Sequence, residues 1–134
     1  MTKFLVLTKY GGSDAPPMAD WKPGEMQAHL DFLRALNKDL VRRGELVEGQ
    51  ALAGPELAKI VTSDGVGAPV VTDGPFPEAK ELLAGYQMVD VDSEARAIEI
   101  AAQVSAAPGP GGVPIAQRIE VRQVMASLVP GADL

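Results

Sequence analysis

The sequence contains no cysteine, a single histidine and a single tryptophan, and aromatic residues make up only 4% of it. The absence of cysteine excludes disulfide bonds, thiol nucleophiles and cysteine-ligated zinc. With one histidine as well, we expect no transition-metal site within one chain. No Walker A or Gly-x-Gly-x-x-Gly sequence follows an expected strand, so no cofactor is predicted. Because aromatic side chains are scarce, the core must be built from Leu, Val, Ile, Ala and Met.

Positive charge is also in short supply, since 12 Lys and Arg stand against 18 Asp and Glu, giving a net charge of −6. Nucleic acid and anionic membranes are bound by clustered cations, so neither partner is expected. The apolar run Phe4–Leu7 is too short for a signal peptide or a membrane span, and we expect a cytoplasmic protein. The length of 134 residues predicts one domain, residues 1–126, followed by a tail at 127–134.

Hydrophobic periodicity and turn residues divide the chain into alternating strands and helices. The expected strands are Phe4–Leu7, Leu46–Leu52, Gly85–Val91 and Ile119–Arg122. The expected helices are Pro23–Arg43, ended by Gly44, then Pro77–Leu83, then Glu94–Val104, capped by Asp92-Ser93. A hairpin is expected from Leu57–Thr62 and Pro69–Thr72, with Asp64-Gly65 as its turn.

Each long helix carries an apolar stripe that predicts its buried face. In the first helix the stripe comprises Met26, Leu30, Leu33, Leu40 and Val41, with Leu36 on its flank. In the second helix the residues expected to point inward are Ala97, Ile98, Ala101 and Val104.

This order of elements predicts an α+β fold, in which a four-stranded antiparallel sheet carries two helices on one face. The other face of the sheet then has no cover within the chain. An apolar sheet face of this kind is stabilised by burial against a partner, and a second copy is the simplest partner. We therefore expect a homodimer in which two sheets meet face to face in a barrel-like assembly.

The loop Tyr10–Pro17, rich in Gly, Pro and Ser, follows the first strand and is expected to overhang any pocket that the sheet forms. Trp21 lies at the far end of this loop. Its side chain could act as a lid or as a dimer contact, but a lone tryptophan here is more simply interpreted as an anchor for the loop.

The densest group of ionisable side chains follows the turn at Asp73-Gly74-Pro75. Asp73 can bond the backbone two residues on, Gly74 allows a positive φ, and the proline stops the strand. Just beyond it, Glu78 and Glu81 would share one face of the expected short helix, near Lys80. Such a group could perform acid–base catalysis or hold a hard cation. The structural alternative is a capping Asp73 beside a solvated charged face.

The run Thr72–Glu81, followed by Gly85-Tyr86, resembles the signature of the YCII-related (DGPF) family, whose members read Asp-Gly-Pro-Phe, an acidic residue, Lys-Glu, and Gly-Tyr or Gly-Phe. The likeness extends through Glu48–Leu52 to Ile119–Arg122. It implies a ferredoxin-like βαββαβ sandwich with an inserted hairpin and short helix, assembled as a dimeric α/β barrel. The activity of the family is largely unassigned. Proteins with this signature resemble accessory partners of extracytoplasmic-function sigma factors, which implies a regulatory alternative.

We therefore expect a cleft near the Asp-Gly-Pro-Phe turn that binds or transforms a small polar metabolite. The candidate catalytic residues are Asp73, Lys80 and Glu81, and the candidate ligand-binding residues are Tyr86, Glu78, His29 and Asn37. His29 could act as a base, although a lone histidine at the edge of an apolar stripe is more often a packing residue. Asn37, near the centre of that stripe, would bond a strand carbonyl or reach a cavity.

Overall fold

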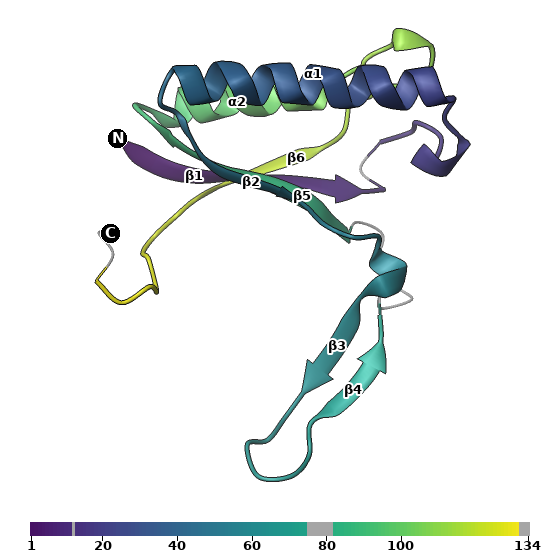
Figure 1. Ribbon diagram of the computed structural model, residues 1–134. Coiled ribbons are helices and arrows are strands. Elements are labelled where there is room, and N and C mark those ends of the chain that lie inside the picture. Colours follow the sequence, from purple (N-terminus) through teal and green to yellow (C-terminus); the bar gives the residue numbers. More distant parts are fainter. Residues whose placement is uncertain (12, 75–81, 132–134) are drawn as a thin grey trace.

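The computed structural model describes residues 1–11, 13–74 and 82–131. Its main body is an antiparallel sheet covered on one face by two helices (Figure 1). The four strands of the sheet are β1 (Thr2–Tyr10), β2 (Leu46–Ala51), β5 (Leu82–Val91) and β6 (Ile119–Gln123), and they lie in the order β2-β5-β1-β6. This α+β architecture confirms the expected sheet with two helices and is compatible with a ferredoxin-like fold.

The two central strands, β1 and β5, extend further than the apolar runs that predicted them. Their ladder begins with Thr2 opposite Val91 and continues to Tyr10 opposite Leu82, with an irregularity after Thr8. The added ends of β1 are largely polar and are held by backbone pairing, which periodicity does not detect. The added end of β5, Leu82–Ala84, is apolar, and Leu82 and Leu83 had been expected in a helix. The last two residues of the expected helix Pro77–Leu83 therefore belong to β5, and its other residues lie outside the described part of the chain.

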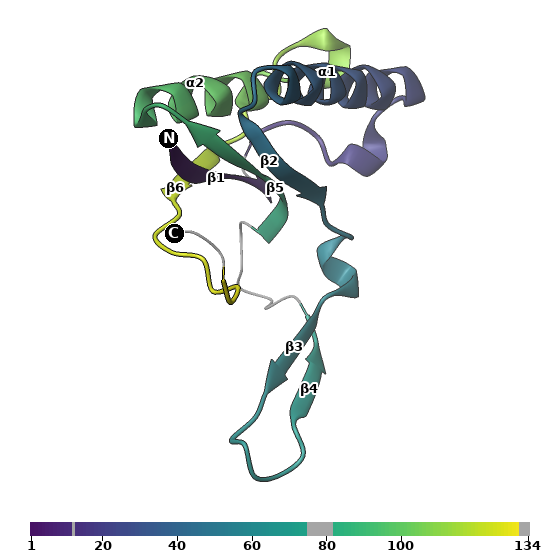
Figure 2. The ribbon, with the colours of Figure 1, turned by 60° about the vertical axis from the view of Figure 1, so that its left-hand side comes forward.

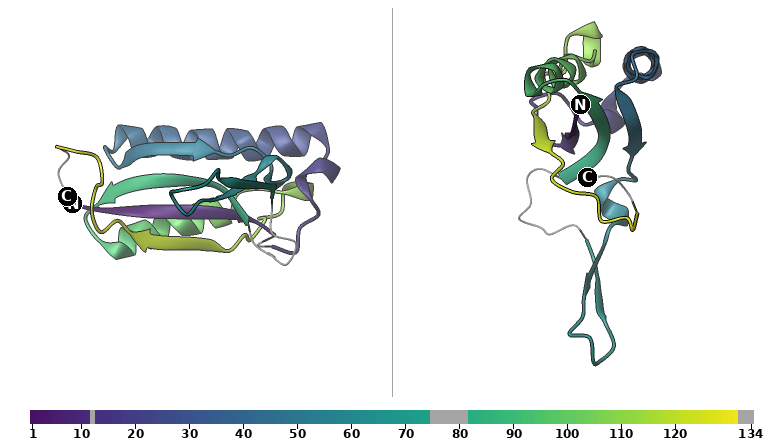
Figure 3. Two further views of the ribbon diagram at one scale, coloured as in Figure 1. Left: turned by 90° about the horizontal axis from the view of Figure 1, so that it is seen from below. Right: turned by 90° about the vertical axis from the view of Figure 1, so that its left-hand side faces the viewer.

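Helix α1 (Pro23–Arg42) lies over β2, and helix α2 (Glu94–Ser105) lies over β1, β5 and β6 (Figure 3). The expected end of α1 is confirmed, because Gly44 has a φ of 72°, which glycine adopts at little cost. The expected cap of α2 is confirmed too, since the hydroxyl of Ser93 accepts a hydrogen bond from the amide of Arg96 at 3.2 Å.

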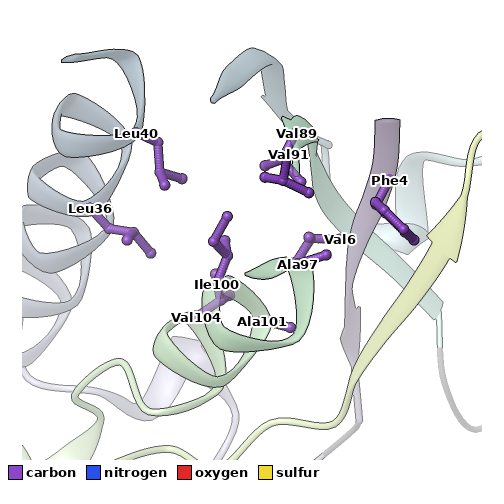
Figure 4. Close-up of a cluster of buried hydrophobic side chains, with 10 residues drawn as sticks. All are labelled: Phe4, Val6, Leu36, Leu40, Val89, Val91, Ala97, Ile100, Ala101 and Val104. Atoms are coloured by element: carbon purple, nitrogen blue, oxygen red, sulfur yellow. The ribbon is translucent and has the colours of Figure 1, made fainter. Parts of the chain in front are cut away.

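The core fills the space between the helices and the sheet (Figure 4). It consists of Phe4, Val6, Leu36, Leu40, Val89, Val91, Ala97, Ile100, Ala101 and Val104.

The predicted buried face of α1 is confirmed for Leu33, Leu36 and Leu40, which pack in or against the core, and it is wrong for Leu30 and Val41. Leu30 and Val41 are 37% and 62% exposed, whereas His29, Leu36 and Leu40 are buried. The buried face follows positions 29, 33, 36 and 40, whose spacing of four, three and four is itself helical. His29 is not aliphatic, so the pattern of aliphatic residues omits this buried position and includes its exposed neighbour Leu30.

The prediction for one residue of α2 is also wrong. Ile98 is 54% exposed, and Ile100 is completely buried in its place. Both are isoleucines within one helical turn, so hydrophobicity could not distinguish them. Packing of α2 against the sheet determines which isoleucine is buried, because Ile100 shares a face with the buried Ala97, Ala101 and Val104.

The expected hairpin is present as β3 (Lys59–Thr62) paired with β4 (Val70–Asp73), and it projects from the body on the side opposite the helices (Figure 2). At its turn Gly65 has a φ of 81°, and the Asp64 carboxylate accepts hydrogen bonds from the amides of Val66 and Gly67. At its base Gly74 does not adopt a positive φ. A side chain there would instead crowd Ala58 and Ile60, at 3.2 Å.

The face of the sheet away from the helices has no cover from either helix (Figure 3). The alternation along the strands places Leu5, Leu7, Tyr86 and Met88 on this open face, and all four are half-buried. The homodimer that would cover the open face remains a prediction.

In the described part of the chain, no helix has the length and apolarity needed to cross a membrane.

A candidate ligand-binding cleft

A cavity of about 330 Å³ lies between α1 and the ends of β1, β2 and β5. Its apolar wall is formed by Met18, Met26, Leu30, Leu33 and Val104. Its volume is within the range of small-molecule sites, which are typically apolar with a few polar groups. A larger hollow of about 540 Å³ lies beside Ser13, Asp14 and Arg118, but none of these polar side chains is buried. The smaller cavity is therefore the better candidate site.

Three polar side chains are buried in the described part of the chain, namely His29, Gln87 and Gln117, and all three line this cavity. Their exposed fractions are 4%, 7% and 8%. Burial of a polar group is unfavourable unless hydrogen bonds compensate for the lost water. Because all three groups surround one cavity, the unfavourable free energy of burying polar side chains is concentrated there.

His29 projects from the buried face of α1, and its Nδ1 lies 3.0 Å from the carbonyl oxygen of Pro108. A carbonyl oxygen only accepts hydrogen bonds, so Nδ1 must carry a proton and donate it. In the neutral ring the other nitrogen, Nε2, then has a free lone pair. Nε2 makes no hydrogen bond with any described residue. The ring is thus held in one tautomer by the backbone, with its basic nitrogen available.

Trp21 packs edge-on against His29, with ring centroids 5.3 Å apart and planes at 82°. Its indole Nε1 donates a hydrogen bond to the carbonyl of Pro16 at 2.9 Å. These contacts hold the loop before α1 against the helix and bring Met18 to the edge of the cavity. The interpretation of Trp21 as a loop anchor fits this arrangement.

Gln87 and Asn37 join the sheet to α1 across the cavity, because the amide Nε2 of Gln87 donates to Oδ1 of Asn37 at 3.0 Å. Gln87 lies on β5 in phase with the buried Gly85, Val89 and Val91, so its side chain faces the helices. Asn37 therefore bonds a strand side chain, not the strand carbonyl that had been one expectation, and it also lines the cavity.

Gln117 reaches the cavity from the segment before β6. The hydroxyl of Ser105 donates to its carbonyl oxygen at 2.5 Å, which ties this segment to the end of α2. The preceding Ala116 is exposed and has a φ of 56°, a conformation that few non-glycine residues adopt. This turn allows both Ile115 and Gln117 to be buried on either side of it.

The charge of the lining is sparse. Arg34 is the one formally charged side chain among the described lining residues, and it is 71% exposed at the rim. No group of His, Asp and Glu that could hold a metal ion occurs among the described residues. The site therefore offers hydrogen bonds and apolar contact rather than strong electrostatic binding.

A family model described as the YCII-related domain matches residues 2–117. The chain belongs to the YCII-related family. It is also similar to Uncharacterized protein R00369 of Rhizobium meliloti (strain 1021), with 29% identity over 93 residues, which are 69% of this chain and 74% of that protein. The YCII-related region includes all three buried polar residues of the cleft.

The residues predicted from the sequence of this YCII-related protein do not all meet at the cleft. His29 and Asn37 line it, whereas Asp73 lies at the end of β4 in an exposed ion pair with Lys59. Three further candidates, Glu78, Lys80 and Glu81, lie outside the described residues.

Tyr86 borders the cavity, but the alternation of β5 directs its side chain to the open face of the sheet. There, desolvation and the nearby Glu48 carboxylate raise the pKa of the Tyr86 phenol, because both disfavour its charged form. Tyr86 therefore stays protonated at neutral pH and can act as a hydrogen-bond donor.

Gln87 and Gln117 were not among the predicted site residues. A signal for Gln87 existed, because it is a polar residue at an inward position of an apolar strand. No local signal exists for Gln117, because its burial depends on the contact with α2 and on the unusual conformation of Ala116.

Proposed function

We propose that this YCII-related protein binds a small polar metabolite in the cleft between α1 and the sheet, and that His29 contacts it. The observation that supports the proposal is the gathering of His29, Gln87 and Gln117 around one apolar-walled cavity. Buried polar groups with unused hydrogen-bonding capacity are a feature of ligand sites, because a ligand restores the bonds lost with water.

If the protein transforms its ligand, His29 is the group suited to move a proton. Its Nε2 can accept a proton from an O–H or N–H of the bound molecule. The carbonyl of Pro108 orients the ring, in the place that a carboxylate occupies in many catalytic pairs. The Pro108 carbonyl fixes the tautomer without placing a negative charge beside the ring.

A metabolite screen by thermal shift on the full chain, followed by calorimetric titration of each hit, tests this function. His29→Asn keeps an amide donor for Pro108 but removes Nε2, and it should weaken binding of the hits by about tenfold or more. Lys38→Ala, an exposed position on the same helix, is the matched control and should leave affinity unchanged. Hits that bind both variants equally, or a screen without hits, would contradict the proposal.

We also propose that the protein acts as a homodimer joined through the open face of the sheet. Leu5, Leu7 and Met88 form an apolar centre on that face, with the Lys9–Glu120 ion pair, at 2.6 Å, near its margin. An apolar centre within a charged margin is typical of an interface.

A cytoplasmic location accords with the cysteine-free sequence and is tested by cell fractionation.

The second candidate function is that of an interaction module for a protein partner. The projecting hairpin favours it, because Val61, Val66 and Val70 are 61%, 93% and 62% exposed there. An extracytoplasmic-function sigma factor is the partner to test, given the resemblance of residues 72–81 to the DGPF signature. Co-purification that is lost in a Val61→Lys/Val70→Lys variant would support this function, and a sigma factor that never co-purifies would count against it.

A further inference from the structure

We infer that the cleft selects an uncharged molecule whose polar head both donates and accepts hydrogen bonds, as a primary amide or lactam on a ring does. Cations and purely apolar molecules of the same shape are rejected. The inference rests on the proposed function and names the chemical class of its ligand.

Several side-chain atoms of the cleft residues make no hydrogen bond within the described part of the protein. With Nδ1 bonded to Pro108, His29 offers an acceptor at Nε2. With its Nε2 bonded to Asn37, Gln87 offers an acceptor at Oε1, and Asn37 offers a donor at Nδ2. The side-chain amide of Gln117 has no hydrogen-bond partner among the described residues and offers both.

These unpaired atoms open onto the cavity. Among the described residues, one fully enclosed side-chain polar atom lacks a partner, and it is Oδ1 of Asp90 on β5. The unpaired atoms of His29, Gln87 and Gln117 are therefore not sealed inside the protein, although their residues are more than nine-tenths buried. All three residues line the cavity, which gives a bound molecule a route to these atoms, and Gln117 also borders a neighbouring cavity of about 480 Å³.

The charge of the cavity lining disfavours a cationic ligand. No carboxylate occurs among the described lining residues, so a buried ammonium would lose its water without gaining a counter-charge from them. Arg34 stands at the rim with the Asp31 carboxylate 3.9 Å away, so it has little effect on a bound cation. An anion gains little from Arg34, because most of that side chain is in solvent.

The buried polar groups of the cavity disfavour a purely apolar ligand. Met26, Leu30 and Leu33 would accommodate a ring. An apolar molecule would nevertheless displace water from His29 and the two glutamines and replace none of its hydrogen bonds. Sites built from buried polar groups reject such analogues strongly, because those groups are left unpaired.

Three probes of one shape test the inference: benzamide, benzylamine and toluene. Each is titrated into the full-length protein, and dissociation constants are taken from amide NMR shifts of α1 and β5, with Trp21 fluorescence as a second readout. Benzamide should bind about tenfold or more tightly than either of the others. Gln87→Leu should reduce that preference, because it weakens the binding of benzamide and strengthens the binding of toluene, and Lys38→Ala should change neither affinity.

Two failures are distinguishable. If the probes shift the cleft resonances but benzylamine or toluene binds as well as benzamide, the ligand class is overturned and the proposed cleft function stands. If none of the probes shifts these resonances, the inference and the proposed function both fail. Gln117→Leu replaces Gln87→Leu if circular dichroism shows that the latter does not fold, and the same loss of preference is required of it.

Discussion

Ile98 and Ile100 differ by two positions in α2, yet Ile98 is 54% exposed and Ile100 is entirely buried. Their environments differ because each step along a helix turns the side chain by about 100°. Ile100 faces the sheet together with Val104, whereas Ile98 faces solvent. The same chemical group therefore contributes very differently to stability at the two positions.

Truncation of the two isoleucines should show this difference. We expect Ile100→Ala to lower the free energy of unfolding by about 2–5 kcal/mol, because it removes buried methyl groups and leaves a cavity. Ile98→Ala should change it by no more than about 0.5 kcal/mol. Urea denaturation followed by circular dichroism measures both. Equal losses for the two variants would show that α2 packs with a different face.

Gly85 illustrates a residue whose role is steric. A Cβ at this position would lie 2.7 Å from the carbonyl oxygen of Gln50 on the neighbouring strand β2. Gly85 is also the glycine of the Gly-Tyr pair that resembles the family signature. Its presence is explained by the close approach of two backbones beside the cleft.

Gly85→Ala should therefore lower the unfolding free energy by about 1–3 kcal/mol, since the backbones must separate. Gly24→Ala is the matched control. A Cβ there meets no atom within 4 Å, so the substitution should stabilise α1 by up to about 1 kcal/mol. Thermal melts of both variants check the opposite signs. A neutral Gly85→Ala would mean that β2 can move away freely.

At the scale of elements, one ion pair fastens α2 to the start of β2. Arg96 donates to both carboxylate oxygens of Glu45, at 2.8 and 2.9 Å, and to Glu99 at 3.1 Å. The side chains of Arg96 and Glu45 are only 23% and 13% exposed. A forked pair with this little exposure is stronger than a typical surface ion pair.

This pair predicts a dependence of stability on pH. The hydrogen bond from Arg96 holds the pKa of Glu45 below its ordinary value of 4.5. The contribution of Glu45 is therefore complete above pH 4.5 and is lost as the pH falls through the lower pKa of the folded state. Glu45→Gln should cost about 1–3 kcal/mol at pH 7 and should flatten the fall in stability between pH 5 and 3.

Urea denaturation at a series of pH values measures this effect. Glu99→Gln is the control, because Glu99 contacts the same arginine but is 66% exposed, and it should alter the pH profile little. If Glu45→Gln retained the full acid sensitivity of the wild type, the other carboxylates would be responsible for it.

At the scale of the whole molecule, the two faces of the sheet have opposite surroundings. One face carries α1 and α2, and the hairpin projects on the other side (Figures 1 and 3). The strand register places the half-buried Leu5, Leu7 and Met88 on that other face. Hairpins of two short strands are marginally stable alone, and apolar sheet faces favour association. Both features would be explained by the proposed dimer.

Light scattering after size exclusion tests the dimer. The wild type should have twice the monomer mass of 14.0 kDa, and Leu5→Glu should reduce it to a single chain by placing a charge in the interface. Val41→Glu, at a 62% exposed position of α1, should remain dimeric. A wild type that runs as a monomer at micromolar concentration would contradict the proposal.

Much of the fold was predictable because its signals are local. Gly44 and Ser93 mark helix boundaries through their own backbone and side-chain chemistry, and Asp64-Gly65 forms the expected turn. The strands were recognised by short apolar runs or by apolar alternation, although β1 and β5 extend beyond the expected bounds. Such features depend on residues close in sequence, so the sequence by itself determined them.

The cleft was decided by the tertiary structure. His29, Gln87 and Gln117 come from α1, β5 and the segment before β6, and their grouping exists only once the helices pack on the sheet. Which isoleucine of α2 is buried, and which face of α1, depend on that same packing. Hydrophobicity along the chain reports that a residue can be buried, while the neighbouring elements determine whether it is, because burial depends on contacts between distant segments.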